Sequence, residues 1–565
     1  MFWVAPYIQG GGIDSPRPAS QRAAAFILTA AMLITLAAPA FAETWYIENG
    51  DITVKAGETG NDVTQNNVTT KNDTDTIITN QKTDTASSNT VTIDAGSDKV
   101  EVTLKDVNID TSSRNKAAVS VTGSGNTTIK LDGDNHLTGG NGIYSNSIGS
   151  LTISGGTVTA TGGNSTGIVG SGGSGIHSGG DVTISGGTVT ATGGDSTGSD
   201  GSGGYGIYSS STTTISGGTV TATGGDSTGS YSSGGYGIYS SGVTISGGST
   251  VTANGGSGKD GSGDGIFSFD PVAISGGTVT AKGGSGEDGE DGGDGIRSFD
   301  PVAISGGTVT AKGGSGEDGS GGRGIISTKS VTISGGTVNA NGGSGKNGNG
   351  GNGIIGSGRV AISGGTVEAA GGSSGSSNGG SGIYSSVIDL SGSLELTAKA
   401  GSPNGKALSQ RGNELDLNTI KDKLGPGAKV TTTDADGKVI AQVPIPRPVE
   451  PEEPSSSSDG GSAAPSAPVS SLPGLTVTDK SGAVISYTST QSGNTLTVCV
   501  GRLTASLHVS LAALRQLRAE GIETIAFQTI LCSTTLSVDE LLAMGGEDAE
   551  VVLTHRFTDS SLTVG

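Results

Sequence analysis

Residues 151–163 read LTISGGTVTATGG, and close copies of this phrase recur along the middle of the chain. The isoleucine of its ISGGTV part stands at positions 153, 184, 215, 245, 274, 304, 333 and 362, which are 29 to 31 residues apart. A second phrase, Gly-x-Gly-Ile, keeps the same interval from Ile143 to Ile383. Self-similarity at a fixed period of this size is typical of solenoids, propellers and arrays, in which each unit buries its apolar face against its neighbours.

The pattern inside one repeat predicts short β-strands. Leu151 and Ile153 flank a threonine, and Val158 and Ala160 alternate with threonines, which is the period-two pattern of a strand. The Gly-Gly between them suits a corner because glycine tolerates positive φ. With the Gly-Ile strand upstream, each repeat has three strands and three bends. A propeller blade needs four strands and roughly 40 to 50 residues, so we predict an all-β fold, a right-handed parallel β-helix (solenoid).

Stacking the copies predicts which side chains face the core. Rungs of a parallel β-helix lie ~4.8 Å apart, so equivalent residues of successive repeats form columns. Two columns are expected to point inward. The valine column holds residues 158, 189, 220, 251, 279, 309, 338 and 367, and the alanine column holds residues 160, 191, 222, 253, 281, 311, 340 and 369.

Charge and the N-terminal residues predict where the protein acts. The chain has 52 Asp and Glu against 31 Lys and Arg, so its surface repels nucleic acid and we expect no such partner. Arg22 precedes a short apolar stretch that ends in Ala-Phe-Ala at residue 42, which is typical of a signal peptide cleaved before Glu43. An uncleaved anchor is the alternative, although the apolar stretch is short for a membrane span. We predict a secreted or cell-surface protein without stable membrane insertion after cleavage.

Changes in composition divide the chain. We expect a leader and signal peptide (1–42), N-terminal capping rungs (43–140), repeat rungs (141–400), closing strands (401–443), a Pro/Ser-rich linker (444–473) and a small C-terminal α+β domain of unknown function (474–565). In the last domain we predict strands at 483–487, 495–500 and 551–557, and a helix at 510–520 with Ser510 as N-cap. Cys499 and Cys532 either form a disulfide or are two buried thiols.

Three stretches of the chain carry a family resemblance. TLKDVNID (103–110), IKLDGDNHLTGGNGI (129–143) and the ISGGTV repeats that follow resemble an exported carbohydrate-binding β-helix family of Gram-positive anaerobic bacteria. The resemblance covers roughly residues 44–400. It implies a polysaccharide-lyase-like fold without catalysis that binds acidic, pectic or other plant cell-wall polysaccharide with calcium. Lys105-Asp106 stands where such a protein is expected to have Asp-Gly, so no calcium ligand is carried over to that corner.

The titratable residues do not predict an enzyme. Catalysis needs a nucleophile or a paired acid and base at one site. The four histidines at 136, 177, 508 and 555 are scattered over cap, rung and C-terminal domain, and no metal-ligand or phosphate-loop motif is found. A polysaccharide-lyase-like enzyme is the catalytic alternative.

Acidic loops between repeats are the candidate calcium sites. Calcium takes six to eight oxygen ligands, and neighbouring rungs bring successive loops together. The alternative is a solvated acidic edge of the rod. The candidate ligands are Asp260, Asp264, Glu287, Asp288, Asp291, Asp294 and Asp318.

The residue after each Gly-Ile is the candidate glycan contact. It alternates with the buried isoleucine, so we expect an exposed strip, and flat aromatic faces pack on sugar rings. The alternative is that the rings only stabilise the rod or lie under loops. The candidate residues are Tyr144, Tyr208, Tyr239, Phe267 and Tyr384; His177, Arg297, Ile326 and Ile355 hold the same position in other repeats.

Two different functions follow from these patterns. The first is a non-catalytic carbohydrate-binding protein, associated non-covalently with the cell wall if it is attached at all, because Leu472-Pro473-Gly474-Leu475 departs from a sortase signal. The second is a structural stalk or adhesin that displays the C-terminal domain. Deletion of that domain discriminates the two.

Overall fold

The computed structural model describes residues 43–286 and 290–444, and within the C-terminal part residues 474–479, 482–485, 487–492, 494–500, 504–529, 533–544, 550–556 and 559–564. The chain divides into two compact units, residues 1–450 and 451–565, and each is described by itself.

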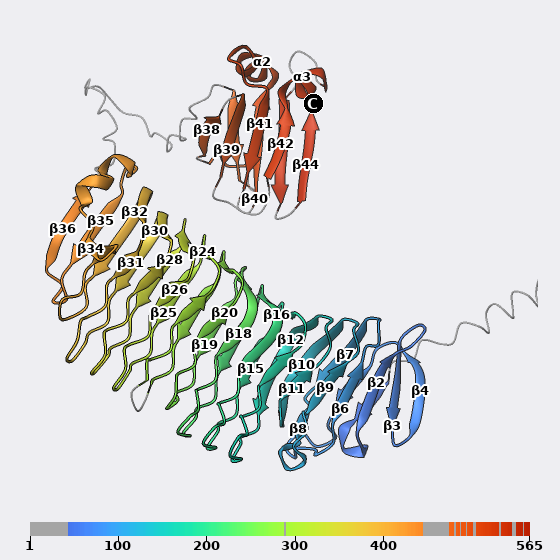
Figure 1. Ribbon diagram of the computed structural model, residues 1–565. Coiled ribbons are helices and arrows are strands. Elements are labelled where there is room, and N and C mark those ends of the chain that lie inside the picture. The colour runs from blue at the N-terminus through green and yellow to red at the C-terminus, as the bar shows by residue number, and fades with distance from the viewer. Residues whose placement is uncertain are drawn as a thin grey trace, which may run out of the picture. The chain divides into compact units, whose positions relative to one another are not determined.

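The first unit is a parallel β-helix of about 15 turns (Figure 1). One repeat shows how a turn is made: β13 (Ile176–Ser178), β14 (Val182–Ile184) and β15 (Thr188–Thr192) follow one another around the rod. Each pairs in parallel with the equivalent residues of the next turn, so that Val189 lies beside Val220 and Ala191 beside Ala222. The parallel β-helix predicted from the repeats is confirmed.

The strands form three columns along the rod. The Gly-Ile column holds β11 (Ile143–Ser145), β13, the first part of β16 (Ile207–Ile215) and of β18 (Ile238–Ile245), β20 (Ile266–Ser268), β23 (Ile296–Ser298), β26 (Ile325–Ser327), β29 (Ile354–Gly356), β31 (Ile383–Ser385) and β33 (Leu408–Gln410). The second column holds β14, β21 (Val272–Ile274), β24 (Val302–Ile304) and β27 (Ser330–Ile333). The third holds β15, β17 (Thr219–Thr223), β19 (Thr250–Asn254), β22 (Thr278–Lys282), β25 (Thr308–Lys312) and β28 (Thr337–Asn341). Four strands run through the glycine corner and join the last two columns, namely β10 (Thr127–Gly139), β12 (Leu151–Gly162), β30 (Arg359–Ala370) and β32 (Ile388–Lys399).

The core is the inside of the rod. Every member of the valine and alanine columns is buried, together with the isoleucines of the ISGGTV and Gly-Ile phrases. The inward assignment is therefore confirmed. Small side chains suffice because three short strands enclose a narrow interior.

Acidic and amide side chains in the loops connect one turn to the next. Asn164, Asp195 and Asp226 each accept, through Oδ1, the backbone N–H of the equivalent residue one turn further on, at 2.8, 2.9 and 2.7 Å. Asp291 does the same for the N–H of Ser320 at 2.7 Å. These oxygens therefore have a structural role in joining the turns.

Irregular elements close both ends of the rod. At the N-terminus β2 (Ile52–Ala56), β3 (Asn61–Gln65) and β4 (Val68–Asp73) pair in antiparallel order, unlike the strands of the repeats. The other elements before the repeats are β1 (Thr44–Tyr46), η1 (Ile47–Asn49), β5 (Ile77–Thr79), β6 (Val91–Asp94), β7 (Val100–Lys105), β8 (Asn108–Asp110), η2 (Ser112–Arg114) and β9 (Val119–Thr122). At the other end lie β34 (Asn413–Glu414), η3 (Leu417–Lys423), β35 (Lys429–Thr433) and β36 (Val439–Pro444), of which β35 and β36 form an antiparallel hairpin.

The described residues of the second unit form two four-stranded sheets and two helices. One sheet has the order β37 (Leu475–Thr478), β40 (Thr504–Ser510), β43 (Glu550–Arg556) and β44 (Asp559–Val564); the other has β38 (Thr488–Ser492), β39 (Thr495–Cys499), β41 (Thr524–Gln528) and β42 (Ser533–Ser537). The helices are α2 (Leu511–Ala519) and α3 (Val538–Met544).

The helix prediction in this unit is confirmed, and one strand prediction is wrong. Ser510 is the N-cap of α2, and its side chain accepts a hydrogen bond from the backbone N–H of Ala513. The strand predicted at 483–487 lies instead at β38, because the Asp479 N–H donates to the carbonyl oxygen of Ala483 and Val484 makes only an isolated bridge to Thr478. Cys532 lies outside the described residues, so the cysteine pairing stays open.

Candidate functional site

The outward side chains of the Gly-Ile column form a row of rings, called the aromatic face below. In-register pairing of β11, β13, β16, β18 and β20 places each ring directly over the next. The aromatic face consists of Tyr144, His177, Tyr205, Tyr208, Tyr236, Tyr239, Phe267, Phe269 and Phe299.

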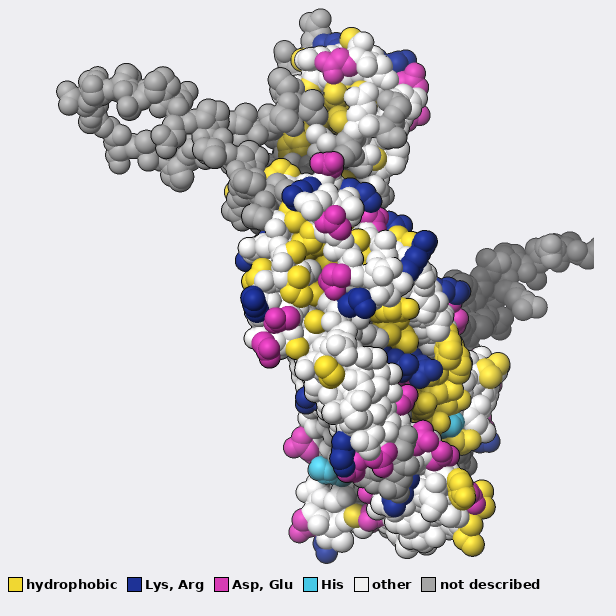
Figure 2. Space-filling model, turned by 60° about the vertical axis from the view of Figure 1, so that its left-hand side comes forward, with side chains coloured by type: hydrophobic (Ala, Val, Ile, Leu, Met, Phe, Trp, Pro, Cys, Tyr) yellow, Lys and Arg dark blue, Asp and Glu magenta, His cyan; other side chains and the backbone are white. Residues whose placement is uncertain are grey.

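The rings of the aromatic face are in continuous contact. Centroid distances are 5.0 Å from Tyr144 to His177, 4.3 Å from His177 to Tyr208, 5.3 Å from Tyr208 to Tyr239 and 5.0 Å from Tyr239 to Phe267. The series continues through Phe269 and Phe299, whose rings stack at 5.7 Å. The rings of the aromatic face are therefore spaced by the distance between successive turns of the β-helix. Figure 2 shows hydrophobic side chains gathered in a band along one flank of the solenoid, beside a group of Lys and Arg side chains.

The predicted exposure of this strip is partly wrong. Phe267 is only 7% exposed, and Tyr144, Tyr208 and Tyr239 are half-buried. The reason is that rings on neighbouring turns cover one another's faces and a second row packs beside them. Tyr384 is 41% exposed but is separated from the series by Ile326 and Ile355.

Four rings of the aromatic face were not among the residues predicted from the sequence. Tyr205 and Tyr236 lie two residues before the first residue of β16 and of β18, and they contact Tyr239 at 5.2 and 5.3 Å. The signal was present, because Tyr-Gly-Ile-Tyr occurs in two successive repeats. Phe269 and Phe299 belong to a repeated Ser-Phe-Asp-Pro phrase in the same way.

A groove lies over one end of the aromatic face. Its volume is about 800 Å³, and its floor includes Tyr144, His177 and Tyr205. A first wall comes from Ser112, Asn115 and Ala117, a second from residues 163–167 and 170–174, and a third from residues 202–204. This volume falls within the range of roughly 300–1,000 Å³ that is typical of ligand pockets.

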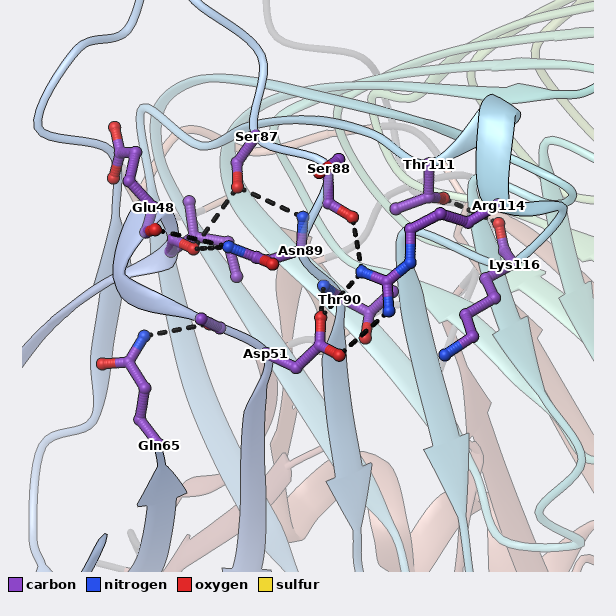
Figure 3. Close-up of polar contacts among 12 residues, drawn as sticks. Glu48, Asp51, Gln65, Ser87, Ser88, Asn89, Thr90, Thr111, Arg114 and Lys116 are labelled. Carbon is purple, nitrogen blue, oxygen red and sulfur yellow. Dashed lines mark hydrogen bonds and ion pairs between the residues drawn. The ribbon is translucent and has the colours of Figure 1, made fainter. Parts of the chain in front are cut away.

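The first wall of the groove is fixed to the N-terminal cap (Figure 3). Arg114 ends η2 and donates to both carboxylate oxygens of Asp51, at 3.0 and 3.1 Å, and to the carbonyl oxygen of Ser88 at 2.7 Å. Asn115 follows in the left-handed conformation with φ 48° and turns the chain back toward β9. The wall therefore depends on a contact between residues that are far apart in sequence.

Breaking this contact should loosen the cap in a pH-dependent way. The hydrogen bond from Arg114 lowers the pKa of Asp51 from 3.8 to about 2. A lowered carboxyl pKa stabilises the fold above the unfolded pKa, and this contribution is lost as the pH falls toward the folded pKa. Arg114→Leu should therefore lower the thermal midpoint slightly near neutral pH, and the difference from wild type should shrink between about pH 4 and pH 2.

Arg411→Leu is the control for this measurement, because the Arg411 Nε donates to the carbonyl oxygen of Ser386 and not to a carboxylate. Its effect on the thermal midpoint should stay constant over the same pH range. A difference for Arg114→Leu that does not change below pH 4 would contradict the assigned pairing.

Comparison with protein families adds one finding. The model of a family described as beta helix repeat matches residues 182–207, 214–238, 272–296, 302–325 and 331–354. The chain is a β-helix repeat protein. A search of curated proteins and a search of solved structures gave no significant match. Within the described residues, no helix has the length and apolarity needed to cross a membrane.

The groove of this β-helix repeat protein is uncharged. None of the described residues that line it is Asp, Glu, Lys or Arg. Burial lowers the pKa of His177, which keeps its imidazole neutral near pH 7, and burial raises the pKa of Tyr205. The lining therefore offers rings, hydroxyls, amides and peptide groups at neutral pH.

Of the predicted calcium ligands that the structure describes, only Asp264 and Asp294 are brought together, with the Asp294 N–H donating to Asp264 Oδ1 at 2.6 Å. Asp264 and Asp294 are 3% and 1% exposed, so the expectation that they lie on a loop edge is wrong. They occupy the position before Gly-Ile, which packs beside the aromatic face. Asp294 lies 3.4 Å from Arg323 and 3.7 Å from Arg297, and burial raises the pKa of both carboxyls. Neighbouring guanidinium groups make this a poor place for a cation.

The other candidates that the structure describes, Asp260, Asp291 and Asp318, lie in exposed loops. Asp291 accepts the Ser320 N–H and Asp318 accepts the Asn347 side-chain amide, while Asp260 is exposed. Glu287 and Asp288 lie outside the described residues. In the part of the chain that the structure describes, no group of three or more His, Cys, Asp or Glu residues could hold a metal ion. Calcium binding stays a prediction.

Proposed function

We propose that this protein is an exported, non-catalytic carbohydrate-binding protein that takes a polysaccharide along the aromatic face. The observation that carries the proposal is the continuous contact of rings from Tyr144 to Phe299. Aromatic rings present broad apolar faces with polar edges, which suits the apolar faces of sugar rings. A straight row of rings on a rigid rod matches an extended polymer better than a compact ligand.

The groove supports binding more than chemistry. General acid–base catalysis needs two groups with suitable pKa values within reach of the same substrate atom. Among the described residues that line the groove, the ionisable ones are His177, Tyr144 and Tyr205, with no carboxylate to serve as the second partner. The lyase-like alternative predicts a different product, since a lyase releases unsaturated oligosaccharides that absorb ultraviolet light.

Removal of two central rings should abolish most of the binding. Tyr208→Ala combined with Tyr239→Ala deletes two stacked rings from the aromatic face, and affinity for the bound polysaccharide should fall about tenfold or more, as for aromatic anchors in other interfaces. Binding is measured by retardation in gels that contain the polysaccharide. The control is Ile326→Ala with Ile355→Ala, which occupy the same register position on later turns.

Equal losses of affinity in the tyrosine and isoleucine double variants would contradict a specific role of the rings.

Deletion of residues 475–565 separates the proposal from the stalk or adhesin alternative. Glycan binding should survive this deletion if the aromatic face binds. Loss of glycan binding in the deletion variant would instead assign the function to the C-terminal unit.

A further inference from the structure

We infer that the groove over Tyr144, His177 and Tyr205 selects an uncharged, hydroxyl-rich stretch of glycan and binds it without calcium. This inference rests on the proposed function and names the ligand class of the same site. It differs from the acidic, calcium-bridged polysaccharide that the sequence suggested.

The first argument is the chemistry of the lining. The groove combines the rings of its floor with the side chains of Asn115, Asn141 and Ser165 and with many glycine peptide groups. Hydroxyl, amide and peptide groups both donate and accept hydrogen bonds, as sugar hydroxyls do. A glycan that is rich in hydroxyl groups and carries no charge therefore finds partners of the right kind on every side.

The second argument is the cost of binding a carboxylate here. An anion removed from water needs a cationic partner, and burial of an unpaired one is strongly unfavourable. Two cations stand beside the first wall and neither lines the groove: Arg114 is paired with both oxygens of Asp51, and Lys116 is exposed. Asp195, whose N–H donates to Asn164 of the second wall, is exposed and adds negative charge near the rim. An acidic glycan would meet repulsion without compensation.

The third argument concerns calcium. The cation takes oxygen ligands, with carboxylates foremost, and none of the described residues lining the groove supplies one. The acidic loop that ends at Asp294 precedes β23, four turns beyond β13, which carries His177. A cation bound at that loop would not reach a glycan held over Tyr144.

The groove is also preorganised. Tyr144 is held against His177, which stacks on Tyr208 with 15° between the ring planes. Ser174 of the second wall donates its N–H to the Asn141 side chain at 2.6 Å. A site that is already ordered loses little conformational entropy on binding.

The test uses the full exported chain, residues 43–565, in gels that contain xyloglucan, mixed-linkage β-glucan, galactomannan or polygalacturonate, each with calcium or with EDTA. We expect retardation by at least one neutral glycan, equal in calcium and in EDTA and little changed by salt. Tyr144→Ala should weaken it about tenfold or more. Tyr384→Ala, at the same register position but separated from the aromatic face by Ile326 and Ile355, should leave it unchanged.

A second variant distinguishes loss of binding from misfolding of the Tyr144→Ala variant. Ala117→Arg adds a long side chain to a half-exposed position in the wall without altering a strand. It should block neutral glycan, whereas a groove for acidic glycan would bind polygalacturonate more tightly after this change. Retardation by polygalacturonate alone, and only with calcium, would overturn the inference and leave the proposed function standing. Retardation by no glycan of either class would overturn both.

Discussion

Val220→Asp should unfold the middle turns of the solenoid. Val220 is 0% exposed and lies in β17 between Val189 and Val251 of the valine column. A carboxylate there has no polar partner on either neighbouring turn, and an unpaired buried charge costs several kcal/mol. Because each turn is stabilised mainly by its neighbours, the damage should extend along the rod from this position.

The matched control is Thr219→Asp, one residue earlier in the same strand, where the side chain is exposed. We expect Val220→Asp to be cleaved near residue 220 in limited proteolysis and to lose β-sheet signal in circular dichroism. Thr219→Asp should resemble wild type in both measurements. Equal protease resistance of the two variants would contradict the inward placement of the valine column.

Gly187→Ala should destabilise the fold, whereas Gly186→Ala should not. Gly187 has φ 79°, and a Cβ added to it would lie 1.6 Å from the carbonyl oxygen of Gly155 on the previous turn. Relief of that overlap requires movement of backbone, in addition to about 1–3 kcal/mol for a left-handed conformation in a residue with a side chain. A Cβ on Gly186 meets nothing within 4 Å.

Thermal unfolding of the two variants checks this pair. The midpoint of Gly187→Ala should fall well below that of wild type. Gly186→Ala should match wild type or exceed it slightly, because alanine restricts the unfolded chain. If the two alanine variants unfolded at the same temperature, the corner would not depend on close approach between turns.

The features that the sequence predicted well are those that repeat. A single valine in a threonine-rich stretch says little, but eight valines at one interval define a column, and the period-two pattern gives its direction. Ser510 and the helix after it were predictable for a local reason, since a cap acts over a few residues. Fold class, core columns and this helix all depend on short-range patterns.

The features that it missed depend on contacts between columns or between distant turns. Alternation alone places Tyr208 and Phe267 outside, and it contains no information on the second row of rings that covers them. Asp264 and Asp294 read as members of an acidic loop, although their position before Gly-Ile puts them inside. Arg114 and Asp51 lie far apart in the sequence and belong to no common sequence pattern, so their contact could not be predicted.

Two neighbouring turns of the rod share most of their sequence, since residues 268–289 and 298–319 are identical. Because each turn is paired only with the turn before and the turn after, a duplicated stretch of gene can be inserted or removed without redesign of the remainder. Each such event would also add or delete one position of the row that carries Phe269 and Phe299. The length of the aromatic face can therefore change during evolution only in steps of one whole turn.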